Sequence, residues 1–515
     1  MPIAKYLFRK FENTLFNLIL ITIPLIYFLY LNPLRDWIEN YDQELWISYN
    51  ALLYLSNLSQ ELFDAPHFLQ IFLLSIFYKI LNIFDFLNIK SINDLNTGDL
   101  NSNLQKIIFF TRIYGLILGT FFILIIKYLL NKFIFQNNKS SLFLTLSLTF
   151  SGGYLIHIQQ HRVEIITLIS FLIAIISLIN FIQNQDKKSL FFFTFFFILS
   201  IMTKIQIMFY APLLFLITLF FQKKINYQDE GLFKFSFYKF VILLSIFLIS
   251  IIFRSEQIQS TLFLITYLSI INILFYFFIF KLFTKKFSAI YHLNLFLLIS
   301  FIIISLMVLL IPSASKELFY PFFRISKIRG HLIDELRGCC DILVWLKFFL
   351  IYFFKNIKTV FENLLLINYI NFLFFEIILL LVVFRKFLNS RIIILTIIIL
   401  LAFLGLKLIE SFRALTNYYQ IYYGWFLLIP IAKIITKLKD KKLKFFIFFI
   451  TLILSILTTI KDGFFHYNYA SDEIKSKNQF YYNRICAEKD FLPMSFWPYW
   501  LNKIKYENIK IYCNW

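Results

Sequence analysis

Apolar runs of about 20 residues recur along nearly the whole chain, and short polar segments separate them. Each run is long enough to cross a bilayer as a helix, and none shows the alternating pattern of a membrane β-barrel strand. Inside lipid the backbone must satisfy its own hydrogen bonds, which a helix does within one segment. The pattern therefore predicts an all-α polytopic membrane protein with about 13 transmembrane helices and additional helices in its outer loops.

The composition agrees with this prediction. Hydrophobic residues make up 60% of the 515 residues, aromatic residues 21%, and the mean hydropathy is +0.75. These values lie outside the range of soluble domains. The net charge of +21 would suit a nucleic-acid partner, but the lysines cluster in short loops between apolar runs. That placement follows the positive-inside rule, so we expect the lipid bilayer as a partner and no nucleic acid.

The cations also predict which loops face the cytoplasm. Lys5, Arg9 and Lys10 precede the first apolar run without a small-residue cleavage site, which indicates an uncleaved signal anchor with a cytoplasmic N-terminus. The cation-rich loops assigned to the cytoplasm are 127–139, 187–188, 223–239, 281–286, 385–391 and 433–444. About 13 spans then leave the C-terminus outside.

This topology divides the chain into a transmembrane body, 1–461, and a small extracytoplasmic cap, 462–515. The body carries a first external loop at about 35–111 and a later external insert at about 313–367. A full span at 68–86 would invert the sidedness of every later loop. We therefore expect that segment to lie in, or dip into, the outer leaflet, with the next span beginning near Arg112.

An acidic, aromatic-flanked segment follows the first apolar run, Tyr41-Asp42-Gln43-Glu44-Leu45-Trp46. Most other polar segments are rich in lysine, so this one is the candidate for chemistry at the membrane surface. The alternative is an ordinary solvated loop.

A second polar segment contains His157, His161 and Glu164, which would share one face of a continuous helix. This spacing permits metal ligation, but Ile158 stands where a zinc protease has its glutamate. The two interpretations are a bound divalent metal and a polar loop lining a cavity; we expect no cofactor.

Isolated cations occur later at apolar boundaries. Lys204 lies between two apolar runs, and Lys407 and Arg413 precede the aromatic pair Tyr418-Tyr419. These cations would hold a phosphate at the outer leaflet or serve as interface anchors beside an aromatic belt. No Walker loop, dinucleotide fingerprint or nucleophile elbow occurs among only 11 glycines, which argues against a nucleotide-linked donor.

The four cysteines are Cys339, Cys340, Cys486 and Cys513, all in segments predicted to lie outside. An oxidising compartment would permit disulfides there, and buried free thiols are the alternative.

The order of these elements resembles the GT-C superfamily of membrane glycosyltransferases, which includes protein O-mannosyltransferases and the aminoarabinose transferases that modify lipid A. The resemblance covers about the first 220 residues and, more loosely, 407–430. The matching segments are Tyr41-Asp42, Asp64-Ala65-Pro66-His67, Thr111-Arg112-Ile113, Arg162-Val163-Glu164, Thr203-Lys204 and Arg413 through Pro430. Gln43 and Val163 depart from the family pattern.

The resemblance implies an inverting transfer of a sugar from a polyprenyl-phosphate carrier to a lipid, glycan or protein acceptor, on the outer side of a bacterial inner membrane. It implies an acidic residue of the first loop as general base; we expect Asp42 in that role, with Glu44 as the second catalytic residue. The residues expected to bind substrate are His67, Arg112, His161, Arg162, Glu164, Lys204, Lys407, Arg413, Tyr418 and Tyr419. A flippase or transporter of lipid-linked saccharides, or a polysaccharide polymerase or ligase, would suit the same features.

Overall fold

The computed structural model describes most of the first 204 residues and much of the region from 342 to 471. The described residues are 2–31, 44–58, 68–96, 100–159, 161–184, 186–204, 207, 210, 292, 295–300, 302–304, 306, 342–365, 368–411 and 421–471. All regular secondary structure in this part of the chain is helical.

The α-helices are α1 (Pro2–Leu31), α2 (Trp46–Leu55), α3 (Phe68–Ile83), α4 (Leu100–Leu130), α5 (Asn138–Thr149), α6 (Gly152–Gln159), α7 (Val163–Asn184), α8 (Lys187–Thr203), α15 (Ile342–Leu364), α16 (Tyr369–Phe384), α17 (Ser390–Ser411), α18 (Ile421–Lys437) and α19 (Lys441–Ser471). The short helical turns are η4 (Ile92–Asn96), η5 (Asn131–Phe135) and η9 (Arg385–Phe387).

Four helical segments of the described chain are long and apolar enough to cross a membrane. They are Phe11–Tyr30, Ser102–Phe135, Glu164–Asn184 and Ser390–Leu408. The pair Phe354–Leu364 and Tyr369–Phe387, bent by 84°, makes five if it counts as one span. The chain is thus an integral multi-pass membrane protein, but the described residues supply four or five spans rather than about 13. Some apolar runs form helices too short to cross, such as the 12-residue α5 and the 8-residue α6.

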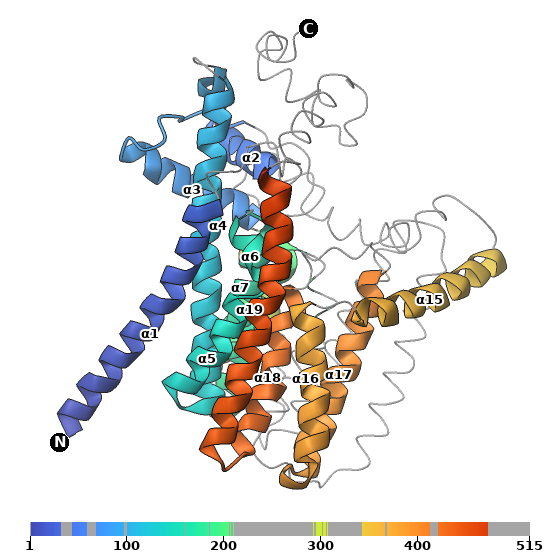
Figure 1. Ribbon diagram of the computed structural model, residues 1–515. Helices are drawn as coiled ribbons and strands as arrows, with labels where there is room; N and C mark the ends of the chain where they lie inside the picture. Colours follow the sequence, from blue (N-terminus) through green and yellow to red (C-terminus); the bar gives the residue numbers. More distant parts are fainter. Residues whose placement is uncertain are drawn as a thin grey trace.

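The turns between helices agree with the predicted grouping of loops. The α4–α5, α16–α17 and α18–α19 turns lie at the same end of the bundle as the N-terminus (Figure 1). These turns fall in the predicted cytoplasmic loops 127–139, 385–391 and 433–444. The predicted loops 223–239 and 281–286 lie outside the described residues. One end of the bundle therefore collects the cation-rich turns, as a common cytoplasmic side requires.

The described residues form two hydrophobic cores. The larger runs through the helical bundle and includes Phe171 and Trp425. The smaller joins α2, α3, η4 and the first turns of α4, with Leu74, Tyr78 and Ile108 buried in it. The described part of the predicted first external loop is therefore a packed helical unit.

One predicted boundary is corrected. The span predicted to begin near Arg112 belongs to a helix that begins at Leu100, because Leu104, Ile107 and Ile108 pack in the smaller core and extend the helix beyond the apolar run. The predicted boundary at 461/462 lies within the residue range of α19, which continues to Ser471, and the division into a body and a cap stays a prediction. Within the predicted external insert α15 is described, whereas 313–341, the part of the predicted cap from 472 onward and all four cysteines lie outside the described residues.

Candidate functional site

Six of the predicted site residues come together where α2, α4, α7 and α8 meet. All six side chains are buried, although they are separated by up to 160 positions in the chain. They form two ion-pair groups that adjoin at the break between α6 and α7. We call this set the ionic cluster; it consists of Glu44, Arg112, His161, Arg162, Glu164 and Lys204.

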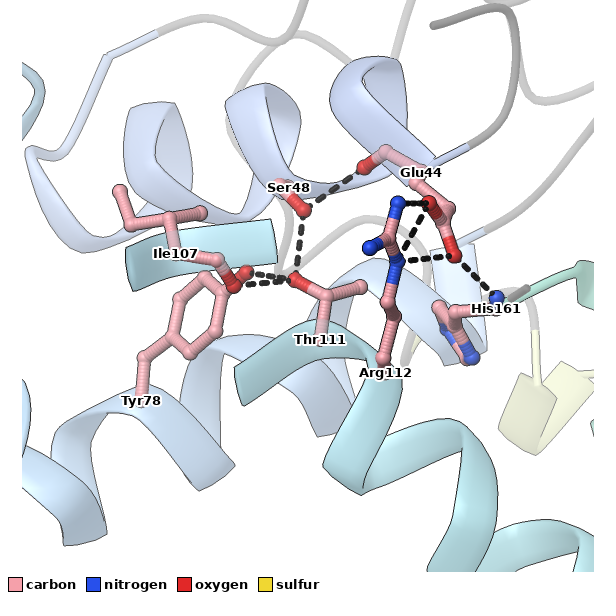
Figure 2. Close-up of polar contacts among 7 residues, drawn as sticks. All are labelled: Glu44, Ser48, Tyr78, Ile107, Thr111, Arg112 and His161. Atoms are coloured by element: carbon pink, nitrogen blue, oxygen red, sulfur yellow. Dashed lines mark hydrogen bonds and ion pairs between the residues drawn. The ribbon is translucent and has the colours of Figure 1, made fainter. Parts of the chain in front are cut away.

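The first group is centred on Glu44, just before α2. Arg112 of α4 places Nη2 3.0 Å from Oε2, and its Nε lies 3.1 Å from Oε2 and 3.3 Å from Oε1. The backbone N–H of His161 donates to Oε1 at 2.6 Å. Figure 2 shows the guanidinium and this backbone nitrogen converging on the carboxylate. Both oxygens of Glu44 are thus engaged by donors.

The second group is centred on Glu164, in the first turn of α7. Its Oε2 lies 3.4 Å from Nε of Arg162, and its Oε1 pairs with the ammonium of Lys204. Lys204 caps the C-terminus of α8, which packs along α7 as an antiparallel hairpin. The helix dipoles favour this pattern, because a carboxylate lies at a helix N-terminus and a cation at a helix C-terminus.

His161 connects the two groups and lies in a slot between α3 and α4. The side-chain amide of Gln70 contacts its Nε2, and the Tyr114 ring meets the imidazole edge-on with centroids 5.2 Å apart. A Cβ at Gly115 would lie 3.1 Å from Nδ1, so glycine lets the ring approach α4. Burial lowers the pKa of His161 to about 3, an effect that the Glu164 carboxylate opposes, so the imidazole is neutral at pH 7.

A chain of hydroxyl groups lies beside the ionic cluster (Figure 2). Thr111 Oγ1 is 2.7 Å from Ser48 Oγ and 2.5 Å from Tyr78 Oη, and burial raises the pKa of Tyr78 above its ordinary value. Ser48 also donates to the Glu44 carbonyl oxygen at 2.7 Å. These contacts join α2, α3 and α4 one residue away from Arg112.

Sequence reasoning missed Gln70 and Tyr78 as site residues. Both belong to the apolar run of α3, where hydropathy marks a membrane segment and nothing marks chemistry. A glutamine inside such a run was the available signal, because a buried amide requires partners.

The remaining predicted residues divide into two sets. Lys407 is buried on α17, with its ammonium 6.0 Å from the centroid of the Phe403 ring. Five predicted residues lie outside the described residues: Asp42, His67, Arg413, Tyr418 and Tyr419.

The helix that would place His157, His161 and Glu164 on one face does not form. α6 ends at Gln159 and α7 begins at Val163, so the chain breaks where the spacing argument assumed continuous helix. Among the residues that the structure describes, no three His, Cys, Asp or Glu side chains are grouped to hold a metal ion.

No protein-family model, no curated protein and no solved structure matches this chain.

Proposed function

We propose that the chain is a glycosyltransferase of the GT-C type. It would move a sugar from a polyprenyl-phosphate carrier to a lipid, glycan or protein acceptor on the extracytoplasmic side of a bacterial inner membrane. The observation that carries the proposal is the buried ionic cluster inside a membrane-embedded bundle. Buried charges are costly there and typically serve an ion, a substrate or a partner. The proposal includes about 13 spans, more than the described residues supply.

In the proposed reaction, an acceptor oxygen bonds to the anomeric carbon while the bond from that carbon to the phosphate oxygen breaks. The acceptor hydroxyl must lose a proton, and the departing polyprenyl phosphate must carry negative charge. Asp42 is the proposed base that takes the proton. Cations of the cluster, with Lys204 and Arg162 foremost, are the proposed stabilisers of the phosphate.

Glu44 has a different proposed role. Its two oxygens already accept from Arg112 and from the backbone of His161, so a proton taken by Glu44 would disrupt those contacts. Asp42 lies only two residues before this anchored position. The role we propose for Glu44 is to position the segment that precedes it, and the base that we propose in that segment is Asp42.

The test is turnover of a radiolabelled polyprenyl-phosphate sugar by purified protein in nanodiscs, with a membrane extract as acceptor. We expect Asp42→Asn to lower the initial rate by about 10²–10⁴-fold, because a general base commonly contributes that much. Donor affinity should not change, since the substitution preserves the size of the side chain.

Asp36→Asn, in the same loop, is the matched control and should retain wild-type turnover. Full activity of Asp42→Asn would rule out the assigned base. If the wild-type protein moved the labelled lipid between leaflets of proteoliposomes without transferring sugar, the flippase alternative would replace the transferase.

A further inference from the structure

A carboxyl group that does not belong to the ionic cluster lies inside the bundle, on α16. Glu376 stands near the middle of this helix and is only 7% exposed. Phe375, Leu379 and Val382 of the same helix are exposed apolar side chains, as on a helix that faces lipid. α16 also lies in the second half of the bent pair that can count as a span. Glu376 is therefore an ionisable group in the apolar part of the bundle, and such groups usually have a function.

Hydroxyl groups of three helices gather on the buried side of α16, and α19 packs against both α5 and α16 (Figure 1). Thr451 and Ser455 lie one turn apart on α19, and both are buried. Oγ1 of Thr451 lies 2.5 Å from Oε1 of Glu376, and Ser455 donates to the carbonyl oxygen of Ser147 on α5. Oγ of Ser147 is 3.0 Å from Oη of Tyr369, two turns before Glu376. We call these five residues the polar seam.

The polar seam contains no counter-charge for Glu376. Among the described residues no ion pair includes this carboxyl, and its Oε2 is buried without a hydrogen-bond partner. The described charged groups on the surrounding elements are Lys139, Arg385, Lys386, Arg391, Lys407, Lys433, Lys437, Lys439, Asp440, Lys441, Lys442 and Lys444. All except Lys407 belong to the cation-rich turns at one end of the bundle, and the Lys407 ammonium lies over the Phe403 ring. An ionised Glu376 would therefore be a buried charge without compensation, which is costly.

The contacts of Thr451 also require a proton on the carboxyl. Its Oγ1 lies 2.8 Å from the carbonyl oxygen of Ile447 as well as 2.5 Å from Oε1 of Glu376. A hydroxyl group has one proton, whereas a carbonyl oxygen and an ionised carboxylate can only accept. With Glu376 ionised, two acceptors would share the single proton of Thr451. With Glu376 protonated, each contact has its own proton, because the carboxyl donates to Thr451 and Thr451 donates to Ile447.

We propose that Glu376 is a proton-binding site, whose carboxyl group carries a proton at pH 7 and donates it in a hydrogen bond to Thr451. A metal cation would need several oxygen ligands, and Thr451 is the one described side chain that hydrogen-bonds to this carboxyl. Protonated carboxyls inside membranes form part of proton relays. The site lies on α16 and α19, whereas the ionic cluster lies on other helices, so the proposal does not rest on the proposed function.

Infrared spectroscopy of the full chain in nanodiscs at pH 7 tests this directly, because a protonated carboxyl has a carbonyl stretch separate from the amide and carboxylate bands. We expect the wild-type protein to show this band, shifted in D₂O, and Glu376→Gln to lose it. Glu362→Gln, which removes an exposed carboxylate of α15, is the control and should leave the band unchanged. Identical bands in wild type and Glu376→Gln would overturn the proposal. Loss of the wild-type band on addition of sodium or potassium chloride would also overturn it, in favour of a metal cation.

A second measurement uses the unsubstituted protein and so does not depend on how Glu376→Gln folds. Dicyclohexylcarbodiimide enters the membrane and reacts with protonated carboxyls: the carboxyl oxygen bonds to the central carbon of the reagent, and the proton moves to one of its nitrogens. Mass spectrometry of peptides from treated membranes should show the adduct at Glu376. Glu164, a buried carboxylate paired with Lys204, is the matched control and should remain unlabelled. Labelling of Glu376 no greater than that of Glu164 would overturn the proposal.

Discussion

The two buried cations of α4, Arg112 and Lys127, are held in different ways. Arg112 forms a forked ion pair with the carboxylate of Glu44. Lys127 instead donates to two neutral amide oxygens of α1, 2.8 Å from Asn13 Oδ1 and 2.6 Å from Asn17 Oδ1. Along the helix the two positions are separated by about 22 Å, most of the hydrophobic thickness of a bilayer. The same helix therefore uses charge pairing towards one end and neutral hydrogen bonding towards the other.

This difference distinguishes the candidate site around Arg112 from Lys127, which anchors α4 to α1. A guanidinium presents its donors in a rigid fork, so pairing with Glu44 fixes both distance and direction, and the pair is neutral overall. An ammonium on a flexible stem accepts varied geometry, and Lys127 connects α4 to the start of the first span without a buried counter-charge among these contacts. The Arg112 end belongs to the candidate site, whereas the Lys127 end associates two helices.

The largest effect should follow Arg112→Met. Removing Arg112 leaves the Glu44 carboxylate buried without its counter-charge, which commonly lowers the free energy of unfolding by about 3–5 kcal/mol. Thermal unfolding in detergent, followed by intrinsic fluorescence, measures the loss. Adding Glu44→Gln should restore most of the stability, because the isolated charge is then gone. A double variant as unstable as Arg112→Met would show that packing of Arg112, rather than charge, dominates.

An intermediate effect should follow Lys204→Met. Glu164 keeps Arg162 as a counter-charge, so the cost should be that of one charged hydrogen bond, about 1.5–3 kcal/mol. The same unfolding assay measures it. A loss as large as that of Arg112→Met would show that Arg162 does not compensate and that Lys204 is the essential partner of Glu164.

The smallest effect should follow Lys127→Met. The amide oxygens of Asn13 and Asn17 lose a donor, but no buried charge loses its counter-charge. We therefore expect the free energy of unfolding to fall by about 1 kcal/mol. Lys441→Met, at an exposed position at the start of α19, is the control and should change stability by less than about 0.5 kcal/mol. If Lys127→Met destabilised the protein as strongly as Arg112→Met, the distinction between site and anchor would be wrong.

Much of the candidate site could be anticipated from residue types. Charged residues in or beside apolar runs, such as Arg112, Glu164 and Lys204, stand out because lipid makes them costly. What could not be anticipated was their pairing: Glu44 meets Arg112 rather than an acceptor, and Glu164 meets Lys204 across a helical hairpin. Ion pairs between distant positions depend on helix packing, which no local pattern encodes.

The sequence by itself determined that the chain is helical and spans a membrane, because hydropathy over about 20 residues is a local property with a direct physical cause. It also determined which turns share one end of the bundle, through the placement of lysines. Tertiary structure alone decided that α6 ends at Gln159 and α7 begins at Val163, so that they are two separate helices, and that α4 starts at Leu100. It alone brought Gln70 of α3 to His161. These outcomes depend on which surfaces pack together, and packing joins residues that the sequence keeps far apart.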